Sequence, residues 1–286
     1  MMELAYRIRQ YIIYPLLLIT ILFAAPAKST ETAELISTDT FVMDNAMIMG
    51  QGITTDGEYY YTSGSITGIN STSLGKYTVD GMDFVANNMD PLPAICKQRG
   101  NNHIGGLSYY NGKLYAPVEG GDDTEVACIV VFDAETLKAT GEVYDLPADA
   151  FPDGVPWCAV DGETGYLYAS KWKDTKVIYV YDVNNGMTLV KELKLDTSIK
   201  RIQGGEFCYG TLYLSQDTHD NGKVRNILSV DIESGKVEIA AERDIGSEKY
   251  EAEGMTFTYT DEGVIMHVLD YNRTIGVFVH HYKVDF

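Results

Sequence analysis

The sequence predicts an all-β fold, a five-bladed β-propeller with four antiparallel strands in each blade. Three observations support this prediction: a strand–turn–strand phrase occurs five times, a second hairpin follows it in several copies, and no long segment has the 3.6-residue period of an amphipathic helix. Taking Tyr60, Tyr115, Tyr168, Tyr213 and Ile265 as equivalent positions gives steps of 55, 53, 45 and 52 residues. Strand repeats with a period of about 40–50 residues are typical of propeller blades.

Each repeat opens with a hairpin whose turn contains glycine. The clearest copy is HIGGLSYYNGKLYAPV, where Asn111-Gly112 separates two apolar strands, which is a strong short-range hairpin signal. The other copies turn at Asp56-Gly57, Asp161-Gly162, Tyr209-Gly210 and Asp261-Glu262-Gly263. Second hairpins such as IVVFDAETLKATGEVYDL and VIYVYDVNNGMTLVKELKL bring each blade to four strands.

The last repeat supplies only three strands, so its blade needs a fourth from elsewhere. Residues 275–284 form the third strand, and ELISTDTFVMD at residues 34–44 is a strand near the other end of the chain. We expect these two segments to pair, because an N-terminal strand that completes the last blade closes the ring and covers a free sheet edge. Residues 28–286 are therefore predicted to form a single domain.

Residues 1–27 have the pattern of a secretory signal peptide. Two arginines in MMELAYRIRQ precede a stretch of 17 uncharged residues that ends in Ala25-Pro26-Ala27, a small-residue cleavage site. The alternative is an uncleaved membrane anchor, because 17 residues is near the lower limit for a membrane span. In either case the propeller is predicted to be secreted or extracytoplasmic.

The charge of the chain argues against one class of partner. With 22 basic and 41 acidic residues, the formal net charge is −19, which disfavours contact with the phosphate backbone of nucleic acid. Solubility explains this charge, with a specific cationic ligand as the alternative, and because the acidic residues are dispersed along the chain, no acidic tail is implied. We expect a monomer that meets a membrane only through residues 1–27, if these are retained.

Four cysteines leave their pairing open: Cys96, Cys128, Cys158 and Cys208. An even number in an exported chain permits two disulfides in any of three connectivities. Cys158 and Cys208 fall on predicted innermost strands, where buried thiols are an equally good interpretation. No pair has the spacing of zinc ligands.

The loops predict which face of the propeller carries a site. The segments before each first strand and the loops between second and third strands emerge on one face, here called the loop face. The hairpin turns emerge on the other, here called the turn face. The turns are short, whereas loops such as PVEGGDDTEV, ASKWKDTK and SQDTHDNGKVRN are long and chemically varied. Function concentrates on loops held by a rigid scaffold, so we expect the site on the loop face.

Different polar or aromatic residues occupy equivalent positions where the central channel should open. They are Gln51, His103, Trp157, Gln203, Glu206, Glu251 and Glu253. We expect them to line one concavity that binds a small-molecule or peptide ligand; solvated channel residues are the alternative. The acid–base candidates are His103, Glu206, Glu251 and Glu253. Converging carboxylates raise one another's pKa, which would provide a proton donor at neutral pH.

Aromatic and acidic side chains on the loop face extend the chemistry of the predicted site. Trp157 and Trp172 are the two tryptophans, and an exposed ring there can stack on a sugar or a side chain, with packing between blades as the alternative. No cofactor is predicted, although converging carboxylates helped by Asp122, Asp123 and Asp217 could hold calcium. No contiguous calcium-binding loop is present.

One stretch of the sequence resembles a known family. The segment QGITTDGEYYYTSGSITGINSTSLGKYTVD resembles the opening blade of plant-type glutaminyl cyclases, which are five-bladed propellers, and QGGEFCYGTLY resembles a later segment with Glu206 at its final glutamate. The resemblance implies cyclisation of an N-terminal glutamine. The acid that the family uses for proton transfer would fall on Tyr61, and the reference pKa of tyrosine is near 10. We therefore predict no robust glutaminyl cyclase activity.

Three functions remain open at this level. Ligand binding is favoured because no catalytic set in the sequence is both complete and specific. The enzyme alternative is cyclotransfer or hydrolysis at the same mouth, with Glu206, Glu251 or Glu253 as acid or base. The third is a protein-interaction platform without pocket chemistry.

Overall fold

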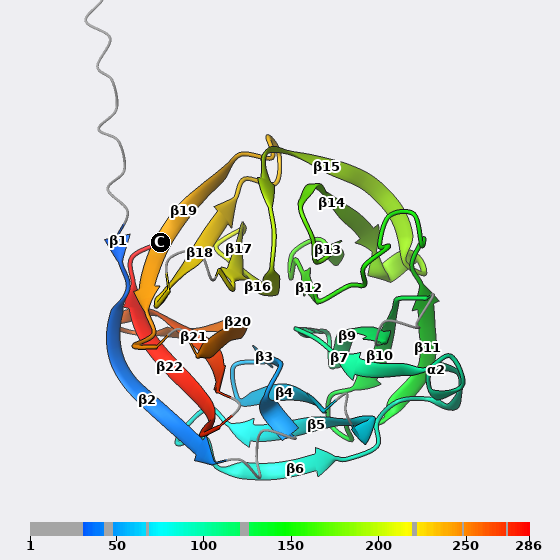
Figure 1. Cartoon of the computed structure of the whole chain (residues 1–286), viewed down its shortest axis with the longest axis horizontal. Helices are drawn as coiled ribbons and strands as arrows, with labels where there is room; N and C mark the ends of the chain where they lie inside the picture. The colour runs from blue at the N-terminus through cyan, green and yellow to red at the C-terminus, as the bar shows by residue number, and fades with distance from the viewer. Residues whose placement is uncertain are drawn as a thin grey trace, which may run out of the picture.

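The computed structural model is a ring of five antiparallel sheets around a central axis, and it confirms the predicted five-bladed β-propeller (Figure 1). The structure describes residues 31–42, 48–66, 69–120, 126–218, 222–247, 249–272 and 274–286. Each sheet is one blade. The first strand of each blade lies nearest the axis, and the last strand forms the rim (Figure 1).

The blades follow one another along the chain. Blade 1 contains β3 (Gly52–Thr55), β4 (Tyr59–Ile66), β5 (Ser71–Thr78) and β6 (Phe84–Asn88). In blade 2, the two short strands β7 (Asn101–Ile104) and β8 (Ser108–Tyr110) both pair with β9 (Lys113–Gly120). The strands β10 (Cys128–Asp133) and β11 (Ala139–Asp145) complete this blade. Blade 3 contains β12 (Trp157–Val160), β13 (Tyr166–Ser170), β14 (Thr175–Asp182) and β15 (Thr188–Ile199). Blade 4 contains β16 (Ile202–Cys208), β17 (Thr211–Gln216), β18 (Val224–Val230) and β19 (Val237–Asp244).

Blade 5 is closed by the N-terminal strand, as predicted. It contains β20 (Tyr250–Thr260), β21 (Gly263–Asn272) and β22 (Gly276–Val284), and β2 (Glu34–Val42) pairs antiparallel with β22. The short strand β1 (Glu31–Thr32), which the sequence did not predict, pairs parallel with the rim strand β19 of blade 4. The N-terminal segment therefore joins blades 4 and 5.

Helical elements with described bounds are short. They are α2 (Ala94–Gln98), between blades 1 and 2, and the single turn η2 (Val183–Asn185). In the described part of the chain, no helix has the length and apolar character needed to cross a membrane. The predicted signal peptide or anchor, residues 1–27, lies outside the described residues.

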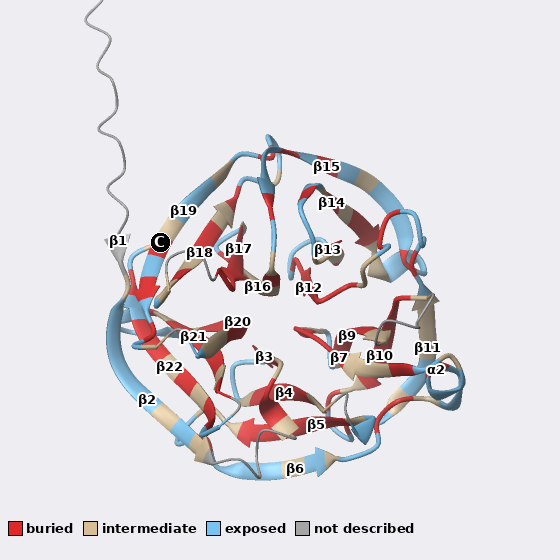
Figure 2. Ribbon diagram, in the orientation of Figure 1, coloured by how far each residue is buried: buried red, intermediate tan, exposed pale blue. Residues whose placement is uncertain are grey.

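The hydrophobic core lies in the wedges between neighbouring blades. Middle strands such as β4, β10 and β17 are buried on both faces, because each sheet packs against a blade on either side. One core cluster fills each wedge, including the closing wedge between blades 5 and 1. Inner and middle strands are mostly buried, whereas the rim strands β2, β6, β15 and β19 are largely exposed (Figure 2). Burial of apolar side chains between blades is thus the main force that holds the ring together.

Glycines close the central channel. A Cβ atom placed on Gly204 would lie 2.6 Å from Cα of Gly254, and one placed on Gly254 would lie 2.7 Å from Cα of Gly52. A Cβ on Gly106 would lie 2.5 Å from the carbonyl oxygen of Gln203. Because Gly106 belongs to blade 2 and Gln203 to blade 4, backbone from blades that are not neighbours meets across the axis. We call Gly52, Gly105, Gly106, Gly204 and Gly254 the glycine plug.

Candidate functional site

Blades 1 and 2 bring three polar side chains together on the loop side of the glycine plug. His103 on β7 faces Glu119 on β9 in the strand register, and Gln51 directly precedes β3. Nε2 of His103 lies 2.6 Å from Oε1 of Gln51, and Nδ1 of His103 lies 3.3 Å from Oε1 of Glu119. Gln51, His103 and Glu119 form what we call the histidine cluster.

The hydrogen bonds of Gln51 fix the roles of the histidine nitrogens. Nε2 of Gln51 donates to the carbonyl oxygen of Gly50 at 3.1 Å, so its Oε1 is the atom that faces the imidazole. Nε2 of His103 must then be the donor. In the neutral imidazole this leaves Nδ1 as an acceptor.

Two atoms of the histidine cluster are buried without a hydrogen-bond partner among the described residues. They are Nδ1 of His103 and Oε2 of Glu119, and the contact between Nδ1 and Oε1 of Glu119 has the distance of an ion pair without the geometry of a hydrogen bond. Oδ1 of Asn101, on the same strand, is also unpartnered within the described chain. A buried polar atom left without a partner costs about 1–3 kcal/mol, so such atoms are rare unless water or a ligand satisfies them.

Blade 3 contributes backbone to this cluster. A Cβ on Gly154, which precedes β12, would lie 2.0 Å from Oε2 of Glu119, and Gly154 has φ +90°. The carboxylate therefore rests directly against this glycine. Glu119 is not among the residues predicted for the site, although the pairing of the strands that carry His103 and Glu119 places the two opposite each other.

Blades 4 and 5 place a charged group on the same side of the plug. Asp217 is fully buried and forms ion pairs with Arg201 and with Nε of Arg225, the latter at 2.8 Å. Arg225 also donates to the carbonyl oxygen of Tyr250 at 2.8 Å, which ties blade 4 to the first strand of blade 5. We call Arg201, Asp217 and Arg225 the arginine cluster.

Glu253 is a buried acid near the arginine cluster. Its exposure is 1%, and burial raises its pKa well above the ordinary value, helped by the negative charges of Glu251 and Asp217. Arg201 opposes the shift. The amide of Gly254 donates to the carbonyl oxygen of Gln51 at 2.9 Å, so the backbone that follows Glu253 adjoins the backbone of Gln51. The raised pKa favours the protonated carboxyl group, which can act as a hydrogen-bond donor.

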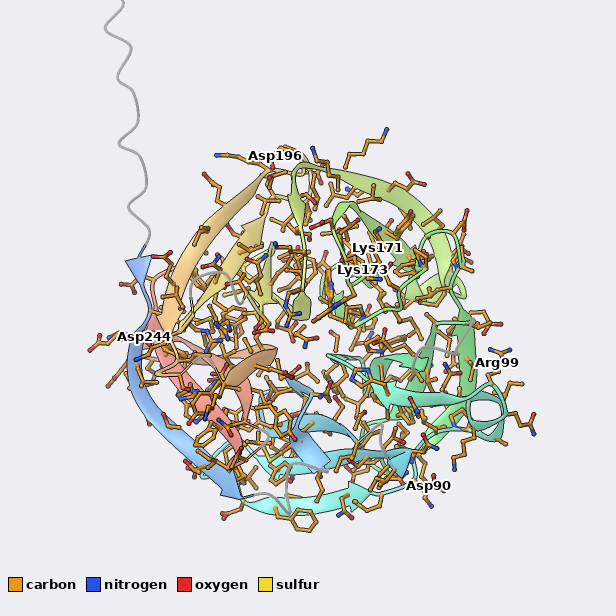
Figure 3. All side chains as sticks on the ribbon, viewed as in Figure 1. Asp90, Arg99, Lys171, Lys173, Asp196 and Asp244 are labelled. Atoms are coloured by element: carbon orange, nitrogen blue, oxygen red, sulfur yellow. The ribbon has the colours of Figure 1, made fainter. Side chains whose placement is uncertain are left out.

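Trp172 and Gln203 are half-buried on the loop side. The guanidinium carbon of Arg201 lies 4.8 Å from the ring centroid of Trp172, so a cation–π contact covers one face of the indole. Lys171 and Lys173 flank Trp172 in the sequence and lie over the inner part of blade 3 (Figure 3).

Trp157 does not line a concavity, and that expectation is wrong. The side chain is fully buried, and its Nε1 donates to Oγ of Ser170 at 3.1 Å. A Cβ on Gly205 would lie 2.8 Å from the indole ring, so the tryptophan packs tightly between blades 3 and 4. The alternative of packing between blades is confirmed.

Glu206 lies on the turn side of the plug, so the expectation that it shares one concavity with the others is also wrong. It follows Gly204 by two residues, and its Oε2 accepts from Oγ1 of Thr54 at 3.0 Å and from Oγ1 of Thr256 at 3.5 Å. Protein surrounds the carboxylate closely, although it keeps some accessible surface at the axis. Burial raises its pKa to about 7, against the lowering effect of these hydrogen bonds and of one from the amide of Phe207.

The predicted calcium ligands are not brought together in the described part of the chain. Asp122 and Asp123 lie outside the described residues, and Asp217 is already neutralised by two arginines. Among the residues that are described, no group of three or more His, Cys, Asp or Glu side chains is arranged to hold a metal ion.

Comparison with known proteins identifies the fold. No protein-family model matches the chain, and no curated protein matches it. Similar solved structures include a Bacteroides ovatus xyloglucan-PUL GH43B protein, with TM-score 0.56, 14% identity, and coverage of 87% of this chain and 55% of that chain. Another is the RS223 β-xylosidase, with TM-score 0.54, 10% identity, and coverage of 86% of this chain and 96% of that chain. A third is an exo-1,5-α-L-arabinanase from a bovine ruminal metagenomic library, with TM-score 0.51, 13% identity, and coverage of 84% of this chain and 93% of that chain.

The chain shares their five-bladed propeller fold. At identities of 10–14% the likeness extends to the fold alone. The chain spans just over half of the Bacteroides ovatus protein, 55% of its length.

Proposed function

We propose that the protein binds a small polyhydroxylated ligand, such as a saccharide, at the loop-side mouth between the histidine cluster and Glu253. The observation that carries this proposal is the pair of buried atoms without partners among the described residues, Nδ1 of His103 and Oε2 of Glu119. Both are acceptors, so the group that satisfies them must be a hydrogen-bond donor. Glu253 directly precedes Gly254, whose amide binds the backbone of Gln51, and its raised pKa favours the protonated form that can donate a hydrogen bond.

A hydroxyl group fits this mixture of acceptors and donor because it both donates and accepts. A ligand with several hydroxyls can satisfy His103, Glu119 and Glu253 together. An ammonium group would satisfy the two acceptors, but it could not accept a hydrogen bond from the O–H of a protonated Glu253, because it has donors only. Several solved propellers of this fold carry the names of enzymes that act on saccharides, which makes saccharides the first class to test.

The test is a calorimetric titration with a panel of neutral mono- and oligosaccharides, polyols and Gln-initiated peptides. Glu119→Gln should weaken binding of the preferred ligand about 10-fold or more, because a charged acceptor of a buried hydrogen bond is lost. The matched control is Glu142→Gln, which changes a glutamate of the same blade that pairs with Lys113 instead. Equal affinities for the two variants would contradict the proposal, as would the absence of binding across the panel.

Hydrolysis at the same mouth is the second candidate, favoured by the environment of Glu253. A glutamate with a raised pKa can serve as the general acid opposite a second carboxyl group, as in glycoside hydrolysis. Glu253 would be the general acid and Glu251 the carboxylate. Release of nitrophenol from aryl glycosides, reduced about 100-fold or more in Glu253→Gln, would support this activity.

Cyclotransfer on a Gln-initiated peptide is the finer alternative suggested by the family resemblance. The hydroxyl of Tyr61 donates to Oδ2 of Asp56 at 2.8 Å, and burial together with this bond raises its pKa. A phenol held in this way is a poor substitute for a carboxylic acid. We keep the prediction of no robust cyclase activity, and rapid formation of a pyroglutamyl peptide would overturn it and assign the acid role to Glu206 or Glu253.

A further inference from the structure

The four cysteines are distributed over three wedges of the core. Cys96 and Cys128 share the wedge between blades 1 and 2, Cys158 lies between blades 2 and 3, and Cys208 lies between blades 4 and 5. All four are buried, and Sγ of Cys96 lies 4.0 Å from Sγ of Cys128. A disulfide requires its two Cα atoms to lie within about 7 Å, so cysteines in different wedges cannot pair without moving whole blades.

We propose that Cys96 and Cys128 form a disulfide when the chain folds in an oxidising environment, and that Cys158 and Cys208 stay thiols. Cys96 belongs to the short helix α2, whereas Cys128 begins the central strand β10. The two sulfur atoms, now 4.0 Å apart, must approach by about 2 Å to reach the S–S bond length. Sγ of Cys158 already donates to the carbonyl oxygen of Tyr115 at 3.2 Å.

The bond would fix the segment that leads into the histidine cluster. Helix α2 is followed by β7, which carries His103. An ion pair between Arg99 and Asp145 already holds the end of α2 to the rim strand β11, and Figure 3 shows Arg99 at the outer edge of the ring. A link from Cys96 to Cys128 would tie the same segment to the middle of blade 2. The proposal stands independently of the proposed function, because it concerns core residues.

The chemistry is thiol–disulfide exchange with a low-molecular-weight disulfide such as glutathione disulfide. Cys96 lies on the short helix α2, so local opening of α2 exposes its thiol, and the thiolate of Cys96 attacks first. A mixed disulfide forms and one glutathione thiolate leaves. Cys128 then loses its proton and attacks the sulfur of Cys96, and the second glutathione leaves. The two cysteines lose two protons and two electrons in total, and the oxidant is reduced to two glutathione thiols.

The burial of both sulfurs predicts when the exchange occurs. Neither cysteine is exposed in the folded protein, so glutathione disulfide reaches them during folding or after local opening of α2. Refolding in a glutathione redox buffer should therefore form the bond much faster than the same buffer acting on the folded, reduced protein.

The experiment is intact and peptide mass spectrometry after refolding in this buffer, with free thiols alkylated in denaturant. The expected result is a loss of about 2 Da from the mass of the reduced protein, a linked pair of Cys96 and Cys128 peptides, and alkylated Cys158 and Cys208. Cys158→Ser is the matched control and should leave the linked peptide unchanged. Four alkylated cysteines, or a linked pair that includes Cys158 or Cys208, would overturn the proposal.

Stability provides a second readout. The cysteines are 32 residues apart in the sequence, so the bond restricts the unfolded chain, and its reduction should lower the Tm by about 5–10 °C. The same reductant should leave the Tm of Cys96→Ser unchanged. A wild-type Tm that does not respond to verified reduction would contradict a bond that stabilises this wedge.

Discussion

Substitution of Gly254 by alanine tests the glycine plug. Gly254 lies where blades 1, 4 and 5 meet at the axis, and a Cβ there would lie 2.5 Å from the amide nitrogen of Ile53 and 2.7 Å from Cα of Gly52. Both neighbours are backbone atoms, so no side-chain rotation can relieve the overlap. The inner strands themselves must move apart.

The magnitude follows from the kind of atom that is displaced. Overpacking of a core costs typically about 1–3 kcal/mol when side chains can adjust. Here the amide of Gly254 also donates to the carbonyl oxygen of Gln51 at 2.9 Å, and moving the strands would strain that bond. We expect a loss of about 3 kcal/mol or more in the free energy of unfolding, which corresponds to a fall of about 6–12 °C in Tm.

The assay is urea unfolding followed by circular dichroism and by the fluorescence of the buried Trp157. The matched control is Gly162→Ala in a hairpin turn of blade 3, where a Cβ would have nothing within 4 Å. This control should stay within about 0.5 kcal/mol of wild type. If Gly254→Ala unfolds like wild type, or if both variants lose the same stability, the inner strands do not meet as described.

Three further predictions concern the closure, the arginine cluster and the turn-side acid. Deleting residues 28–44 should lower the Tm sharply, because it removes β2 from β22 and uncovers an edge of blade 5; a truncated protein that melts like the parent would contradict the closure. Asp217→Asn should cost about 3–5 kcal/mol in urea unfolding, since it leaves two guanidinium groups without their counter-charge, whereas Asp196→Asn on the exposed rim should cost little. The pKa of Glu206 in the folded protein, about 7, is raised above its value in the unfolded chain, so this residue opposes stability increasingly as the pH rises from about 4.5 to 7. The Tm advantage of Glu206→Gln over wild type should therefore be larger at pH 8 than at pH 5, and an advantage that does not grow with pH would contradict this assignment.

The fold and its closure could be predicted from the sequence because their signals are local. Turn glycines such as Gly112 and Gly210 recur at blade spacing, and an unpaired strand at each end of the chain predicts the pairing of β2 with β22. The strand β1 could not be predicted, because two residues carry no periodicity of their own. Only the completed rim strand β19 provides their partner.

The sequence indicates which residues lie near the loop face, but not how deep each of them lies along its inner strand. Glu253 directly precedes Gly254 of the glycine plug, whereas Glu206 lies two residues after Gly204 of the plug. The glycine plug therefore separates the two acids. The plug itself depends on contacts between blades that are far apart in the sequence. The burial of Trp157 against Gly205 has the same origin.

The decisive measurement is a crystal structure of the protein with its preferred saccharide. We expect two ligand hydroxyl groups, one within about 2.7–3.2 Å of Nδ1 of His103 and one within the same distance of Oε2 of Glu119, on the loop side of the glycine plug. A ligand bound on the turn side or at the rim would contradict this expectation. So would a structure in which protein groups alone satisfy both atoms and leave no room for a ligand oxygen.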